Sequence, residues 1–396
     1  LIQIMRSLSR SFDNITCALT GGHDTRLLSS LLIHAGLKAQ YYTFGELFGA
    51  DGKIAKQIAQ ICGFPYKFIH FATPDILSSW DKICRQIMQQ GDGMAPVDLI
   101  TSVLFNLNLR FDRLPVDLGG TGGDLARRGL YSTYDLFLNK YGVVDMQDYM
   151  VKKVISDYGG LINKEGIELA RDCICRFVSQ YTDDGFHPID IPHAFFLYSR
   201  VRRKRGSNKR VQMQYQDFFT PFFSRPFIEA VFSISTLQRH SAPIHYNLIK
   251  ILSPELHELP LDTGPWRSQR PVLELTKYYG KMTLRRIIRQ VSGIFANASE
   301  SKKISKKFHT STGMFDQESW FKAKRAQLRE FCLDQTESII WNFVNRSLFE
   351  SITSATTAPS GPSRHGANID LFFRIATLFY YESSSNHSYN DLTPFR

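Results

Sequence analysis

The feature that most constrains the fold of this chain is a glycine turn between an apolar segment and an amphipathic one. The sequence Ile15-Thr-Cys-Ala-Leu-Thr-Gly-Gly-His-Asp-Thr-Arg26 is followed by leucines at helical spacing. It predicts a short buried strand, a tight turn at Gly21 and Gly22, and a helix that ends near Gly36. This arrangement directs backbone N–H groups and the positive end of a helix at one point, which is how many folds hold a phosphate.

The acid inside this loop limits the kinds of ligand that the loop could bind. Asp24 would repel a bare phosphate, so its position favours a bridging cation such as Mg²⁺. The two common phosphate loops are excluded, because the chain has no GxxxxGKS or GxxxxGKT pattern and no GxGxxG follows this strand. The alternative is a glycine turn that joins a strand to a helix for packing only.

A second glycine-rich stretch lies about a hundred residues further along. The sequence Val116-Asp-Leu-Gly-Gly-Thr-Gly-Gly-Asp124 again places an apolar strand before a loop that ends in an acid. Two acids that follow separate strands can bind one metal ion only if the fold brings their loops together. The pair of loops therefore constrains the function more than either loop alone.

Strand and helix signals alternate along the first third of the chain. Strands are expected at 15–19, 39–44, 66–71 and 116–118, and helices at 25–35, 51–62, 75–90 and 98–110. This alternation predicts an α/β fold with a doubly wound, mostly parallel sheet that binds its ligand at the carboxyl ends of the strands. Helical signals dominate beyond residue 131, so we expect an α-rich second half.

Both loops resemble motifs of one family. Thr20–Thr25 is similar to the pyrophosphate loop, commonly SGGxDS, of the N-type ATP pyrophosphatases. Gly119–Asp124 is similar to the SGEGxDE loop of the asparagine synthetase-like family, whose synthetase domain carries both loops. The resemblance covers roughly residues 1–270 and includes Tyr215–Ser224 and Pro254–Pro260. It implies the PP-loop fold, also called adenine nucleotide alpha-hydrolase-like.

The resemblance also implies a set of site residues. In this family both loop aspartates hold the Mg²⁺ that neutralises the departing pyrophosphate. Asp24 and Asp124 would therefore be the metal ligands and catalytic residues. The expected pyrophosphate-binding residues are Thr20, Gly21, Gly22, Asp24 and Thr25, and the expected ATP contacts are the backbones of Leu19, Phe44, Gly119 and Gly120.

The implied activity is that of an ATP-dependent carbon–nitrogen ligase with ATP and Mg²⁺ as cofactors. A substrate carboxylate attacks the α-phosphate, pyrophosphate leaves, and an amine captures the acyl-adenylate as an amide. Thr121 and Leu125 replace acids of the family pattern. The expected lysine is missing, so either an arginine such as Arg267 or Arg270 fills its role or no residue does. Arginine stabilises charge but does not shuttle a proton, so ATP binding is better supported than aspartate amidation.

Three other functions stay open. The first is an amide ligase of specialised metabolism, or of a glycan or peptide pathway, with a non-aspartate acid. The second is a tRNA-modifying PP-loop enzyme, and the third is a degenerate ATP-binding scaffold. Seven basic residues lie between positions 200 and 210 in a chain of net charge +11. A solvated helix face is the favoured interpretation, with nucleic-acid contact or contact with the triphosphate as alternatives.

The sequence also suggests three parts and a location. We expect a nucleotide-binding core at 1–135, a helical part of the synthetase domain at 136–290 and a helical extension at 291–396. The sequence contains no glutaminase domain ahead of this core. Either such a domain is missing from this sequence, or we expect ammonia, another amine or a separate glutaminase as nitrogen source. No apolar run reaches the roughly 18–20 residues of a membrane helix. Six cysteines without CxxC spacing favour reduced thiols and a cytoplasmic protein.

Overall fold

A five-stranded parallel sheet forms the core of the region that contains both glycine loops. The computed structural model describes residues 1–44, 50–69, 77–78, 80–91, 93–95, 116–127, 144–155, 159–213, 216–262, 264–270, 280, 317–354 and 365–386. The strands are β1 (Ile15–Ala18), β2 (Gln40–Phe44), β3 (Tyr66–Ile69), β4 (Val116–Leu118) and β5 (Asp217–Phe219). Their order is β3-β2-β1-β4-β5, and every neighbouring pair is parallel. The expected α/β fold with a parallel sheet is confirmed.

The direction of winding reverses between β1 and β4. From β1 the chain passes through α2 (His23–His34) to β2 and through α3 (Ala50–Cys62) to β3. It then returns to place β4 on the other side of β1. In open α/β sheets ligands bind at such a switch point, beyond the carboxyl ends of the strands. Both glycine loops begin at this point, one after β1 and one after β4.

The four strands expected from the sequence are confirmed, but the fifth was missed. The sequence beyond residue 131 shows mainly helical patterns, so it did not predict β5. This strand is only three residues long and has no buried residue. Its pairing with β4 is what makes it a strand. The Gly119 N–H donates to the Phe219 carbonyl at 3.0 Å, so β5 also fixes the start of the second glycine loop.

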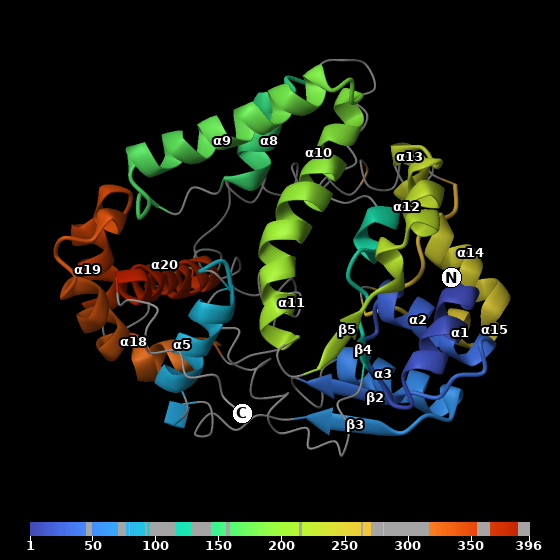
Figure 1. The fold of residues 1–396 in the computed structure, drawn as a ribbon. Helices are drawn as coiled ribbons and strands as arrows, with labels where there is room; N and C mark the ends of the chain where they lie inside the picture. Colours follow the sequence, from blue (N-terminus) through green and yellow to red (C-terminus); the bar gives the residue numbers. More distant parts are fainter. Residues whose placement is uncertain are drawn as a thin grey trace, which may run out of the picture.

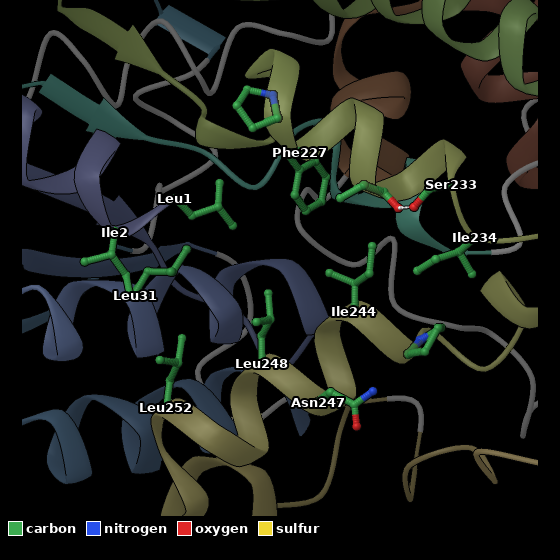
Figure 2. Close-up of a pocket in the computed structure, with 13 residues that line it drawn as sticks. Leu1, Ile2, Leu31, Phe227, Ser233, Ile234, Ile244, Asn247, Leu248 and Leu252 are labelled. Carbon is green, nitrogen blue, oxygen red and sulfur yellow. Dashed lines mark hydrogen bonds between the residues drawn. The ribbon is translucent and has the colours of Figure 1, made fainter.

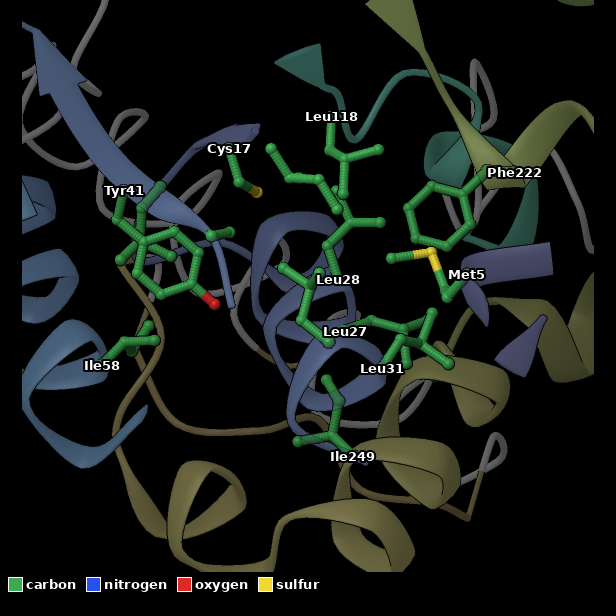
Figure 3. Packing of buried hydrophobic residues seen from close by; sticks show 14 of the residues in the cluster. Met5, Cys17, Leu27, Leu28, Leu31, Tyr41, Ile58, Leu118, Phe222 and Ile249 are labelled. Atoms are coloured by element: carbon green, nitrogen blue, oxygen red, sulfur yellow. The ribbon is translucent and has the colours of Figure 1, made fainter. Parts of the chain in front are cut away.

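Helices cover the sheet and close a large apolar core around it. These are α1 (Ile2–Ser11), α2, α3, α14 (Pro243–Leu252) and α15 (Pro254–Glu258). The leucine stripe of α2 is buried between β1 and α14, as its helical spacing predicts (Figure 3). The core takes residues from Met5 to Leu256, so residues far apart in sequence pack around one sheet.

Two further helical clusters lie beside the sheet (Figure 1). The larger contains α5 (Trp80–Gly91), α18 (Gln317–Leu333), α19 (Arg346–Ser354) and α20 (His365–Asn386), packed around aromatic side chains. The smaller contains α8 (Met146–Val154), α9 (Lys164–Asp183) and α10 (Ile191–Ala194). The helix expected at 98–110 and the boundaries expected at 135 and 290 lie outside the described residues.

Three consecutive helical segments form one continuous helix that links the smaller cluster to the sheet (Figure 1). It consists of α10, the π-helix η4 (Phe195–Arg205) and α11 (Gly206–Gln212). Further helices are η2 (Gly123–Ala126), η3 (Pro188–Asp190), η5 (Pro221–Phe223), α12 (Arg225–Phe232), α13 (Thr236–Arg239) and η6 (Ile339–Asn342).

Within the described segments, no helix combines the length and apolarity needed to cross a membrane. All six cysteines are free thiols.

A buried carboxyl group links three strands of the sheet. Asp117 on β4 is 3% exposed and accepts hydrogen bonds from the Tyr42 hydroxyl at 2.9 Å and the Thr16 hydroxyl at 3.2 Å. Burial raises the pKa of Asp117 to about 6, although the charge of Lys209 and these hydrogen bonds oppose the shift. A carboxyl whose pKa is raised by folding stabilises the protein below its unfolded pKa, and this contribution is lost as the pH rises through 6.

We therefore expect Asp117→Asn to flatten the pH dependence of stability. The asparagine oxygen can accept both hydrogen bonds, and the variant has no charge to bury. Between pH 4 and 7 the unfolding free energy of the wild type should fall by about 2–3 kcal/mol relative to the variant. Denaturant unfolding at a series of pH values measures this difference. The exposed Asp172→Asn is the control, and parallel curves for Asp117→Asn and the wild type would contradict the assignment.

Candidate functional site

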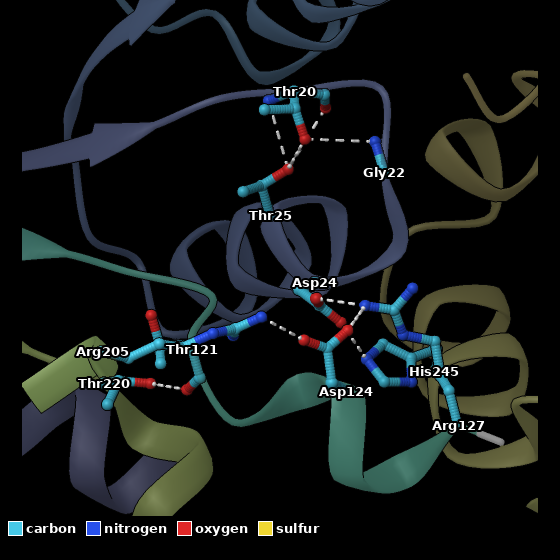
Figure 4. Close-up of polar contacts among 10 residues, drawn as sticks. All are labelled: Thr20, Gly22, Asp24, Thr25, Thr121, Asp124, Arg127, Arg205, Thr220 and His245. Atoms are coloured by element: carbon cyan, nitrogen blue, oxygen red, sulfur yellow. Dashed lines mark hydrogen bonds and ion pairs between the residues drawn. The ribbon is translucent and has the colours of Figure 1, made fainter. Parts of the chain in front are cut away.

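The hydroxyl groups of the first glycine loop form hydrogen bonds within that loop. The Thr20 N–H donates to the Thr25 hydroxyl at 3.2 Å, and the Gly22 N–H donates to the Thr20 hydroxyl at 3.2 Å. The two hydroxyl oxygens lie 3.0 Å apart (Figure 4). Threonine therefore replaces the serines of the SGGxDS pattern without loss of the hydrogen-bonding group. Among the residues that the structure describes, no side chain caps α2, so its first-turn N–H groups can bind an anion.

The second glycine loop packs directly on Asp24. A Cβ atom at Gly123 would lie 2.3 Å from the Asp24 Oδ1, and one at Gly120 would lie 2.8 Å from the Asp24 Cβ. Gly122 has a φ of 98°, a left-handed conformation that favours glycine. The glycines of this loop thus leave room for the acid of the other loop. The loop then turns into η2, which carries Asp124.

The structure brings Asp24 and Asp124 together through one guanidinium group (Figure 4). Arg127 Nη2 lies 2.6 Å from Asp24 Oδ2 and also contacts Asp124 Oδ1. Arg205 Nη2 lies 2.9 Å from Asp124 Oδ2. His245 Nε2 lies 2.9 Å from Asp24 Oδ1. The convergence expected from the two loops is present, and three nitrogen-bearing side chains surround it.

The charges around Asp24 keep it ionised. Burial opposes its ionisation, but Arg127 and His245 outweigh this effect and hold the pKa of the carboxyl below its usual value. Burial also lowers the pKa of His23 to about 3, with Arg127 and His245 acting in the same direction. His23 is therefore a neutral imidazole at physiological pH. Its ring packs edge-on against Trp266, with centroids 5.1 Å apart.

A cavity of about 540 Å³ opens at this meeting point. Its size is typical of small-molecule sites. The wall contains three acids and four arginines, the latter from three separate segments of the chain. The lining residues are Thr20, Gly22, His23, Asp24, Thr25, Gly120, Asp124, Arg127, Phe196, Arg200, Arg205, Ala242, Asp262 and Arg267.

Three described residues that were expected at the site, Leu19, Gly21 and Gly119, do not line this cavity. The Leu19 N–H donates to the Tyr42 carbonyl at 2.8 Å, and the Gly119 N–H is used by β5, so both amides are occupied within the sheet. The Gly21 carbonyl accepts from a buried arginine. Phe44 ends β2, and its side chain lies outside the described part. The roles of these residues in nucleotide binding stay predictions.

One of the two departures from the family pattern in the second loop has a local structural explanation. Leu125 stands where the pattern has an acid, and it is fully buried in the core around the sheet. The Thr121 carbonyl accepts a hydrogen bond from the Thr220 hydroxyl at 2.6 Å, which ties the second loop to the end of β5 (Figure 4). At position 125 the chain gains packing in place of a charge. The contact at position 121 uses the backbone, and nothing in the structure explains the threonine side chain there.

The π-helical turn explains how two arginines of the basic stretch reach the cavity. In a π-helix the backbone hydrogen bonds join residues five apart, so Arg200 and Arg205 share a face. Phe196 lies on the same face, and the Arg205 guanidinium is 5.3 Å from its ring centroid. Arg202 and Arg203 are exposed. The alternative that basic residues between 200 and 210 approach the ligand therefore gains support for two of them.

A buried arginine fixes the shape of the first loop. Arg26 on α2 is 0% exposed, and it donates to the carbonyls of Leu256 at 3.1 Å, Leu259 at 2.6 Å, Pro260 at 2.6 Å and Gly21 at 3.2 Å. Burial lowers the pKa of Arg26 to about 10, which leaves it charged at neutral pH. The segment after α15 is thereby held against the first loop.

This anchoring brings two further charged residues into the cavity. The Asp262 N–H donates to the Gly21 carbonyl at 3.3 Å, and Arg267 donates to the His240 carbonyl at 2.9 Å. Both residues line the cavity. Sequence reasoning placed Arg267 here only as a replacement for the family's lysine. It missed Arg26, Arg127 and His245, because nothing in their local pattern distinguishes them from surface or core residues.

A second cavity does not suit a charged ligand. It has a volume of about 550 Å³ and lies between α1, α2, α12 and α14 (Figure 2). Its polar side chains are Ser233 and Asn247, and its other lining residues are apolar: Leu1, Ile2, Leu31, Pro226, Phe227, Ala230, Ile234, Pro243, Ile244, Leu248 and Leu252. The cavity between the glycine loops is therefore the candidate site.

The residues of the candidate site fit Mg²⁺ only with help from a ligand. Mg²⁺ is usually bound by one or two carboxylates together with phosphate oxygens and water. Asp24 and Asp124 supply two carboxylates at one point. Among the residues that the structure describes, no group of three or more His, Cys, Asp or Glu could hold a metal ion. Phosphate oxygens and water would have to complete the coordination.

Comparison with models of known protein families and with curated protein sequences finds no match for this chain. The resemblance to the asparagine synthetase-like family therefore depends on the two glycine loops and the segments near 215 and 254.

Arg26→Lys should destabilise the protein even though it conserves the charge. A lysine presents one ammonium group and cannot reach the four carbonyls that the planar guanidinium contacts. With one to two buried acceptors unpaired, we expect the free energy of unfolding to fall by about 2–4 kcal/mol. Denaturant titration measures it, with the exposed Arg225→Lys as the matched control. A loss below about 0.5 kcal/mol, the usual limit for surface changes, would contradict this role.

Proposed function

We propose that this protein is an ATP-dependent carbon–nitrogen ligase of the asparagine synthetase-like type, with a PP-loop fold. A substrate carboxylate is activated as an acyl-adenylate, and an amine then captures the acyl group as an amide. The main support is the meeting of Asp24 and Asp124, which come from loops after two adjacent parallel strands. This meeting point lies where an α/β sheet binds its ligand.

The chain's own groups favour a departing pyrophosphate in this cavity. The uncapped first turn of α2 offers backbone N–H groups and the positive end of the helix dipole. Arg127, Arg200, Arg205 and Arg267 add fixed positive charge around the same space. Groups of this kind stabilise negative charge as it develops on a leaving group. The first loop would thus hold the β- and γ-phosphates.

Mg²⁺ held by Asp24, Asp124 and phosphate oxygens would supply further neutralisation of the leaving oxygens. Phe44 and the backbones of Leu19, Gly119 and Gly120 are proposed to contact the rest of the nucleotide. The carboxylate substrate would be attracted by the arginines of the cavity wall. Ammonia, another amine or a separate glutaminase is proposed as the source of nitrogen.

The adenylation step has more support than the amide-forming step. None of the described residues that line the cavity is a lysine. Arg267 follows Pro260 where the resemblance implies one, and arginine stays protonated, so it stabilises charge without accepting a proton from the amine. This favours an acid or amine that differs from those of aspartate amidation, as in specialised metabolism or a glycan or peptide pathway.

Asp24→Asn and Asp124→Asn should each abolish pyrophosphate release. Each variant removes one of two charges that act on one leaving group, so the double variant should be no worse than either single one. The assay is pyrophosphate release from Mg-ATP, screened over carboxylic acids with ammonium as acceptor. Asp172→Asn, an exposed change, is the control. Near-wild-type release by Asp124→Asn would overturn the assignment, and ATP binding without release for any acid would favour the scaffold.

The arginines of the π-helix should differ in their contribution to ATP affinity. Arg205→Gln should weaken ATP binding about 10- to 100-fold, because a charge-assisted contact is worth about 1.5–3 kcal/mol. Arg202→Gln, on the same helix with the same charge change, should leave ATP affinity nearly unchanged. Equilibrium titration with ATP measures both affinities. If instead the wild type binds tRNA with submicromolar affinity at physiological salt and Arg202→Gln loses it, the tRNA-modifying function would take precedence.

A further inference from the structure

Every carboxylate oxygen of Asp24 and Asp124 is already in contact with a nitrogen atom of the protein. Arg127 Nη2 contacts Asp24 Oδ2 and Asp124 Oδ1. Arg205 Nη2 lies 2.9 Å from the other oxygen of Asp124, and His245 Nε2 lies 2.9 Å from the other oxygen of Asp24. A metal ion that binds both aspartates must therefore take the place of at least one of these contacts.

Arg127 is the contact that such an ion has to replace. Of the three side chains it is the one that touches both aspartates, so its guanidinium lies where a shared cation would lie (Figure 4). It lines the cavity, and its side chain is 29% exposed. His245, in contrast, is 0% exposed and packs against Phe222 in the core. Arg127 thus borders the open space of the cavity, whereas His245 is enclosed.

Replacement of Arg127 is costly for a metal ion that arrives alone. The ion must shed part of its hydration shell and also remove a guanidinium that already neutralises the two carboxylates. The displaced guanidinium would be left in a cavity with three other arginines. A polyphosphate changes this balance, because its negative charges give Arg127 a new partner and provide the metal with further oxygen ligands.

We propose that Arg127 acts as an internal cation that keeps Mg²⁺ out of the Asp24–Asp124 site until a polyphosphate binds. Metal and nucleotide then bind cooperatively, and the aspartates are never left as an uncompensated pair. The proposal rests on the proposed function, to which it adds an order of events and a residue that sets it. It also explains why an arginine follows the second loop by one turn, three residues after Asp124.

Arg127→Gln should create a metal site that needs no nucleotide. The probe is Mn²⁺, whose free concentration is measured by electron paramagnetic resonance in the absence of ATP. We expect Arg127→Gln to bind Mn²⁺ about 5- to 150-fold more tightly than the wild type, the usual range of coupling between sites. Adding Asp124→Asn to Arg127→Gln should remove this gain, which assigns the bound ion to the aspartate pair.

Two control variants separate local displacement from overall charge. Arg200→Gln removes one arginine from the same cavity wall, and it should leave Mn²⁺ affinity at the wild-type level. Arg127→Lys keeps a cation at the position and should also remain close to the wild type. Equal gains in Arg127→Gln and Arg200→Gln would show that net charge alone controls the metal, and this would overturn the proposal.

The wild type supplies a test that does not depend on the folding of Arg127→Gln. Tight binding of Mn²⁺ to the wild type without nucleotide, lost in Asp124→Asn, would show that Arg127 does not exclude the metal. These measurements use no ATP and no substrate, so their outcome is independent of the ligase activity. A gain in Arg127→Gln without pyrophosphate release from any acid would support the internal cation and reject the ligase.

Discussion

The contact between Asp24 and the second glycine loop is the constraint on which the site depends. The acid is on the first turn of α2, and the backbone of Gly120 and Gly123 lies against it with no space for a side chain. This contact fixes the distance between the loops that follow β1 and β4. Asp124, one residue beyond Gly123, is brought by the same contact to the guanidinium that also binds Asp24.

The features that the sequence predicted are those determined by the pattern of apolar and glycine residues along a short segment. Short apolar runs that alternate with helical patterns identified four strands, and the leucine stripe identified α2, because both depend on neighbouring residues alone. The meeting of Asp24 and Asp124 was also predictable, since the carboxyl ends of parallel strands share one edge of a sheet. The nucleotide contacts of Leu19, Phe44 and Gly119 were inferred from resemblance and remain untested by this structure.

The features that the sequence did not predict depend on tertiary contacts. Strand β5 exists because β4 offers it an edge, and its three residues carry no alternating pattern. Arg200 and Arg205 share a face only because the helix is π-helical there, whereas a helical period of 3.6 residues places them apart. Arg127 and His245 acquire their roles from partners that are more than a hundred residues away.

The buried Arg26 has a consequence for the order in which this protein forms during synthesis. Its guanidinium binds carbonyls that follow it by more than 230 residues, at Leu259 and Pro260. While those residues are still inside the ribosome, the first glycine loop lacks the partner that holds its Gly21 end in place. A nascent chain that already contains both aspartates therefore has an incomplete candidate site, and it completes that site only when a much later segment emerges and docks.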